Sequence, residues 1–128
     1  MKKVLTFFLL LLLSGALWAQ DYQIQLDPSV PEEAAELLTQ RFTQMLSAGG
    51  APSLTLAVSA QVTSRMETSG SLSQVALTVD LTASAGEQQE IFTLKGVGES
   101  EADAWLRAAK QLIPTSKAAR AFVERLKE

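Results

Sequence analysis

Two consecutive segments alternate apolar and polar residues at every second position, and this pattern constrains the fold more than any other feature. In residues 54–63 the leucines, valines and one alanine occupy the even positions, and in residues 74–83 the apolar side chains occupy the odd ones. A period of two places alternate side chains on opposite faces of a β-strand. We therefore expect two long, adjacent, antiparallel strands. The four side chains expected to face the helices are Leu56, Val58, Leu77 and Val79.

The segment before these strands predicts a short strand followed by a helix. Residues 22–26 alternate in the same way and end just before a proline, which is disfavoured in the centre of a sheet. The helix should begin at a capping box formed by Ser29 and Glu32 and end at Gly49-Gly50. Its apolar stripe, at helical spacing, is Ala34, Leu38, Phe42, Met45 and Leu46.

The remainder of the chain predicts one more strand and two helices. A tight turn at 84–87 leads into a strand at 90–95, and Ser100 and Ser116 each precede a helical apolar stripe. The fold class is therefore α+β. It consists of a short N-terminal strand, a helix, a three-stranded antiparallel meander and two C-terminal helices packed on one sheet face.

Residues 1–19 have the pattern of a secretory signal peptide, in which two lysines precede a short apolar run and small residues follow it. The run is shorter than the roughly 20 residues of a membrane-spanning helix. We expect cleavage after Ala19, with cleavage after Ala16 as the alternative, and a single α+β domain over 20–128. Since no cysteine stands at the cut to carry a lipid, the predicted product is periplasmic or secreted, with no direct membrane anchor.

The chain contains no cysteine and no histidine, which excludes many kinds of chemistry. Disulfides, thiol nucleophiles, imidazole bases and zinc sites of Cys or His ligands are all ruled out. The formal net charge of −3 becomes −5 when Lys2 and Lys3 leave with the signal segment, which argues against a nucleic-acid partner. We expect no enzymatic activity, no cofactor and no metal site.

The run Lys95-Gly96-Val97-Gly98-Glu99-Ser100 joins a predicted strand to a predicted helix. Such a junction can bind phosphate, but the third glycine of the dinucleotide fingerprint and the Lys-Ser/Thr pair of a P-loop are both missing. We therefore expect Gly96, Gly98 and Ser100 to form a structural junction. At least one of the glycines should have a positive φ or lie too close to the following helix for a Cβ.

Residues 65–73, between the two long strands, are rich in serine and threonine and contain Gly70. They predict an exposed hairpin loop or a splayed strand end. The side chains selected as candidate partner contacts are Arg65, Met66, Glu67 and Leu72.

Isolated carboxylates offer the only route to an enzyme. Asp80 lies in the middle of a predicted strand, and Glu99, Glu101 and Asp103 cluster where a helix should begin. Acids at a helix N-terminus are stabilised by the unpaired amides there, which explains the cluster without any catalytic role. A lone acid such as Asp80 is a poor catalyst without a second titratable group.

The order of elements and the residues around the glycine junction carry a family resemblance. A strand that ends in Gly96-Val97-Gly98-Glu99-Ser100 and leads into an alanine-rich helix resembles a bacterial envelope lipoprotein group. This group includes the curli secretion channel, the penicillin-binding-protein activators and related flagellar-assembly proteins. The resemblance implies a binding module or assembly subunit rather than a catalyst. The chain departs from the group because it lacks the lipobox cysteine.

Three functional hypotheses follow. The first is an exported, non-catalytic binding or assembly module of the cell envelope that holds an envelope protein partner or associates with itself. The second is a small secreted inhibitor or adaptor that acts through the 65–73 loop. The third is a carboxylate-dependent enzyme that combines Asp80 with an acid of the 99–103 cluster.

Overall fold

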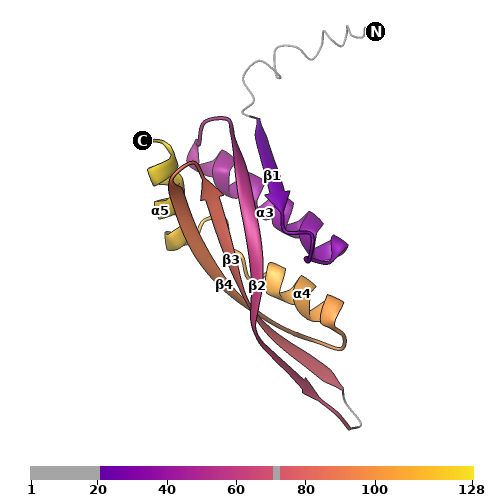
Figure 1. Ribbon diagram of the computed structural model, residues 1–128. Helices are drawn as coiled ribbons and strands as arrows, with labels where there is room; N and C mark the ends of the chain where they lie inside the picture. Colours follow the sequence, from indigo (N-terminus) through magenta and orange to yellow (C-terminus); the bar gives the residue numbers. More distant parts are fainter. Residues whose placement is uncertain (1–20, 71–72) are drawn as a thin grey trace, which may run out of the picture.

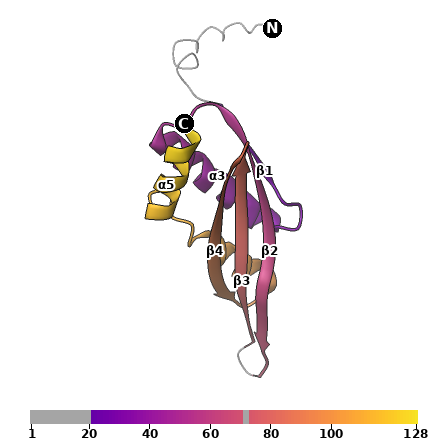
Figure 2. The same cartoon turned by 60° about the vertical axis from the view of Figure 1, so that its left-hand side comes forward.

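The computed structural model describes residues 21–70 and 73–128. The elements in these ranges are β1 (Tyr22–Leu26), α3 (Glu32–Gly49), β2 (Leu54–Thr68), β3 (Gln74–Ala85), β4 (Gln88–Gly98), α4 (Glu101–Ala109) and α5 (Lys117–Leu126). The strands form one sheet in the order β1-β2-β3-β4, and the helices lie on one side of it (Figures 1 and 2). The predicted α+β fold is confirmed. The signal segment, both cleavage positions and Leu72 lie outside the described residues.

The sheet is mixed. β2, β3 and β4 form the predicted antiparallel meander, while β1 runs parallel to β2, with Ile24 opposite Leu56. The alternation at 22–26 predicts the strand but not its direction. The parallel pairing arises because α3 carries the chain back to the starting end of β1 before β2 begins, as a crossover between parallel strands requires.

The core lies between the helices and the facing side of the sheet. Leu56, Val58, Leu77 and Val79 are all buried, which confirms the predicted facing of the two long strands. Three aromatic rings join the layers through edge contacts. The ring centroids of Phe42 and Phe92 are 5.9 Å apart, and those of Phe92 and Phe122 are 6.3 Å apart.

The short strand β1 is attached at both ends. At its start the Tyr22 hydroxyl donates to the Ala51 carbonyl oxygen at 2.6 Å, and burial raises the pKa of Tyr22. Just past its end the Asp27 carboxylate accepts from the backbone amides of Ser29 and Ala60, each at 3.0 Å. These hydrogen bonds favour the charged carboxylate, and they hold the pKa of Asp27 below its ordinary value.

The expected capping box at Ser29 and Glu32 is wrong. Pro31 occupies the N-cap of α3, where no side chain makes a capping hydrogen bond. The Ser29 amide is used by Asp27 instead, because an aspartate two residues earlier can close a local turn through its own carboxylate.

The other helix ends follow the sequence signals. α3 ends at Gly50, whose φ of 75° is the left-handed conformation that glycine adopts without strain. Ser100 accepts from the Asp103 amide and Ser116 from the Ala119 amide, each at 3.2 Å. Both C-terminal helices therefore begin at a serine cap, as predicted.

Candidate functional site

The distal part of the β2–β3 hairpin, residues 64–68 and 74–78, is called the arm. Its β3 strand is still paired with β4, down to Val75 opposite Gly98, so only its β2 strand forms a free edge. Figure 1 shows the end of the arm beyond α4, at the bottom of the view. All β2 residues of the arm are exposed, whereas Val75 and Leu77 on β3 remain buried. The difference arises because α4 contacts β3 and β4 and leaves this half of β2 uncovered.

Three of the four candidate partner residues lie in the arm. Arg65, Met66 and Glu67 belong to β2, which continues to Thr68, so a loop that begins at residue 65 is wrong. The alternative of a splayed strand end is also wrong, because these residues remain paired with β3; their exposure was predicted correctly. The extension is stabilised by pairing with β3, down to Thr68 opposite Gln74.

A bulge at Thr63 reorients the residues of the arm. Val62 pairs with Val79 and Ser64 with Thr78, so the register skips Thr63, whose hydroxyl donates to the Thr78 carbonyl oxygen at 3.2 Å. One extra residue in a strand exchanges the faces of every side chain that follows it. Consequently Arg65 and Glu67 lie on the helix side of the sheet and Met66 lies on the open side. Strict alternation from Leu54 predicts the opposite arrangement, with Met66 buried and Arg65 exposed, so the alternation does not reveal the bulge.

Arg65 connects the arm to the start of α4. Its Nε lies 3.0 Å from Oε1 of Glu101, and its Nη1 lies 3.2 Å from Oε1 of Glu67. The hydrogen bonds to Glu101 and Glu67 raise the pKa of Arg65. All three side chains are substantially exposed, so the cluster orients the arm rather than stabilising a core.

On the open side of the sheet an apolar row crosses the arm. Met66 pairs with Ala76, and Ala76 pairs with Val97. Met66 is 66% exposed and Val97 is 48% exposed, so the row is presented to solvent. Its neighbours on the same face are polar, with Thr78 opposite Lys95 and Asp80 opposite Thr93. A contiguous exposed apolar row on a polar surface is typical of a protein contact site.

The glycine junction is a site of close packing. Neither Gly96 nor Gly98 has a positive φ, so that part of the expectation is wrong. The alternative part, close approach to the helix, is what the structure shows. A Cβ on Gly96 would overlap the Ala104 carbonyl oxygen and would lie 3.0 Å from the Ala108 Cα. A Cβ on Gly98 would lie 2.7 Å from the Ala104 amide nitrogen.

The start of α4 has little capacity to bind an anion. Asp103 accepts from the Glu99 amide at 3.1 Å, and Ser100 accepts from the Asp103 amide at 3.2 Å. Asp103 also contacts Arg107 at 3.3 Å. Backbone donors that would hold a phosphate are thus already bound by the chain's own side chains, one of which is itself negatively charged.

The carboxylates of the enzyme hypothesis do not meet. Asp80 lies on the open side, where its Oδ1 accepts from the Thr93 hydroxyl at 2.7 Å. Glu101 and Asp103 belong to α4, on the helix side of the same sheet. The sheet separates them, so the structure does not assemble the proposed acid pair. Among the described residues no group of three potential metal-ligating side chains comes together.

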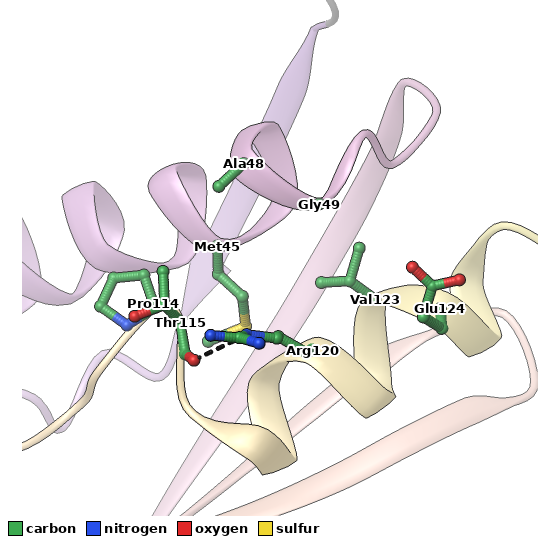
Figure 3. A pocket seen from close by; sticks show the side chains of 8 residues that line it. All are labelled: Met45, Ala48, Gly49, Pro114, Thr115, Arg120, Val123 and Glu124. Atoms are coloured by element: carbon green, nitrogen blue, oxygen red, sulfur yellow. Dashed lines mark hydrogen bonds between the residues drawn. The ribbon is translucent and has the colours of Figure 1, made fainter.

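A hollow of about 260 Å³ lies between the end of α3 and α5 (Figure 3). Its charged lining groups are Arg120, whose Nε donates to the Thr115 carbonyl oxygen at 2.9 Å, and Glu124, which pairs with Lys127 at 2.9 Å. The other lining residues are Met45, Ala48, Gly49, Pro114 and Val123. No polar side chain is buried in the part of the chain that the structure describes. In this hollow Arg120 and Glu124 are each bound to another group, so they do not form a general acid and base that face each other.

Comparison with known proteins adds only distant structural likeness. No family model matches the chain, and no curated protein matches it. Among solved structures the chain is similar to a minor lipoprotein from Acinetobacter baumannii, with 11% sequence identity and a TM-score of 0.37 over 84% of this chain and 89% of that one. Values this low assign neither a family nor an activity. No helix in the described ranges is long and apolar enough to cross a membrane.

Proposed function

We propose that this chain is an exported bacterial envelope protein, periplasmic or secreted, that acts as a non-catalytic module and holds a protein partner through the open face of the arm. The observation that carries the proposal is the Met66–Ala76–Val97 row. It combines exposed apolar side chains with a position on the open side of the sheet, which no helix covers, and the Arg65–Glu101 contact supports the arm from the other side.

The shape of the arm suits contact with a protein more than with a small ligand. Small-molecule sites are concave and bury most of the ligand, whereas this row crosses the open face of three paired strands. A flat row with one flexible methionine can pack into a pocket on a partner, since a few central apolar side chains commonly dominate binding at protein interfaces. An inhibitor or adaptor role would use the same surface, and the identity of the partner distinguishes it from assembly.

Affinity capture from an envelope extract tests the proposal with a matched pair of variants. Met66→Lys introduces a charge into the row, and Gln61→Lys introduces the same charge on the same strand and the same open face but before the bulge. We expect Met66→Lys to lose the captured partner and Gln61→Lys to retain it. Equal capture by both variants would place the contact elsewhere.

Export is tested separately by mass analysis of the N-terminus of the protein recovered from the producing cell. We expect a chain that begins after Ala19 or after Ala16. A product that retains Met1 in the membrane fraction would contradict export by a cleaved signal peptide.

A further inference from the structure

The outer edge of β4 has no neighbour among the described strands. β4 is the last strand in the order β1-β2-β3-β4, so only one of its sides is paired. It is 11 residues long, while β1 at the opposite edge has 5. A long unpaired edge is a template for another strand, and this one shares only Val97 with the apolar row of the arm.

Hydrogen bonds identify which residues of β4 point outward. The Gln89 carbonyl oxygen accepts from Nη2 of Arg125 at 3.0 Å, so the Gln89 main chain faces α5 rather than β3. In an antiparallel ladder the residues alternate between bonding their neighbour and facing away from it. Ile91, Thr93, Lys95 and Val97 therefore also face outward. The Thr93–Asp80 side-chain bond agrees, because such close contacts are typical of pairs without ladder bonds.

We propose that two copies of this chain pair through this edge, with antiparallel β4 strands related by a two-fold axis at Leu94. The free stretch runs from Ile91 to Val97, since Arg125 occupies the carbonyl of Gln89. A two-fold axis at Leu94 sets Ile91 opposite Val97 of the second copy and Thr93 opposite Lys95. All four outward residues are then paired, and Arg125 keeps its bond.

The neighbouring register fits less well. If the two-fold axis lay at Thr93, Val97 would stand opposite Gln89 of the second copy. Pairing there would compete with Arg125 for the Gln89 carbonyl. The arrangement centred on Leu94 avoids that competition.

The exposed apolar side chains follow the same symmetry. Ile91 is 55% exposed and Val97 is 48% exposed, and both lie on the open side of the sheet. The two-fold axis places Ile91 of each copy opposite Val97 of the other, so the interface contains two such pairs. Cross-strand apolar pairs of this kind stabilise sheets. Lys95, the single charge within the free stretch, would face a threonine rather than another lysine.

Charge on the helix side is also complementary. A hollow beside this edge is lined by Lys95, Gly96, Val97, Arg107, Lys110 and Gln111, three of which are cations. In the proposed register Glu90 of the second copy lies opposite Gly98, next to this hollow. Glu90 already pairs with Arg125 at 2.9 Å, so its position is fixed before association.

A proline pair tests whether this edge forms the interface. Thr93→Pro removes the outward-facing backbone amide of residue 93, which lies within the free stretch. Gln89→Pro removes the outward-facing amide of residue 89, which lies on the same strand but outside that stretch. In sedimentation or light-scattering measurements we expect a wild-type dimer, an unchanged Gln89→Pro dimer, and a dissociation constant about 100-fold higher for Thr93→Pro. A wild-type protein that is monomeric at every concentration, or a Thr93→Pro dimer as tight as wild type, would overturn the proposal.

Cysteine cross-linking tests the register and still applies if Thr93→Pro fails to fold. The chain has no cysteine of its own. A mixture of Thr93→Cys and Lys95→Cys should form a disulfide-linked dimer under mild oxidation, because these residues stand opposite each other within disulfide reach. Either variant alone should remain uncross-linked. Cross-linking of Thr93→Cys with itself, or no cross-linking in the mixture, would overturn the register centred on Leu94.

Discussion

The two halves of β2 belong to one continuous strand and have very different surroundings. In the first half, Leu56 and Val58 are buried against the helices, while every residue from Gln61 onward is exposed. β3 pairs with β2 from Ala57 to Thr68, but β1 pairs only with residues 54–58. The first half therefore has a second neighbouring strand and helices above it, and the second half has neither. We call the covered part of the molecule the body, in contrast to the arm.

The largest expected difference in stability between the body and the exposed half of β2 lies at one cross-strand pair. Val79 and Val62 stand opposite each other, but Val79 is fully buried and Val62 is 41% exposed. Val79→Asp should lower the free energy of unfolding by about 3–5 kcal/mol, because it buries an unpaired charge. Val62→Asp should lower it by less than about 1 kcal/mol. Chemical denaturation of both variants measures the difference, and comparable losses would show that the boundary lies elsewhere.

Much of the fold could be predicted from the sequence because local rules decide it. The period of two at Leu77 and Val79, the serine caps at Ser100 and Ser116, and the glycine stop after α3 each depend on nearby residues alone. The parallel direction of β1 depends on where α3 returns the chain. The bulge at Thr63 depends on which face of the arm the helices leave open, so alternation alone did not reveal it.

The candidate site was predicted only in part, because local composition reveals exposure but not the pairing of distant strands. Arg65, Met66 and Glu67 were selected as a loop on local composition, since serine, threonine and glycine follow them. Their exposure was predicted correctly and their secondary structure was not. The apolar row also needs Val97, which is more than 20 residues away and joins Met66 only through the register of three strands.

The next largest effect should come from the contact between β4 and α4. Gly96→Ala introduces a Cβ against the backbone of Ala104 and Ala108, and we expect a loss of about 1–3 kcal/mol from overpacking. Lys95→Ala, one residue away on the open side, should change stability by less than about 0.5 kcal/mol. Thermal melts compare the two. An unchanged melting temperature for Gly96→Ala would mean that the helix moves aside at little cost.

A smaller effect is expected at the charged groups that support each half of β2. The lowered pKa of Asp27 means that its contribution is present above the ordinary aspartate pKa of 3.8 and is lost as the pH falls through the folded-state value. Asp27→Asn should therefore melt earlier than wild type at neutral pH and show a flatter melting curve against pH below about 4. Glu101→Gln removes the charge that pairs with Arg65 of the arm. It should change neither the melting temperature at neutral pH nor its dependence on pH below about 4. Parallel acid profiles of the two variants would contradict the assignment.

Deletion of Thr63 should have the smallest effect. The pairing with β3 skips Thr63, so its removal costs the exposed hydroxyl bond to the Thr78 carbonyl oxygen but leaves every cross-strand pair in place, with Met66 still on the open side. We expect a change in the free energy of unfolding below about 1 kcal/mol and undiminished partner capture. Loss of folding would show that the bulge is required for the strand to curve past the body.

Amide hydrogen exchange along β2 tests the central claim most directly, namely that the body carries the stability and the arm does not. We expect amides in residues 54–60 to exchange only through global unfolding, and amides in 64–68 to exchange about 100-fold faster or more through local opening. Uniform protection from Leu54 to Thr68 would contradict the account, because the arm would then be part of the same cooperative unit as the body.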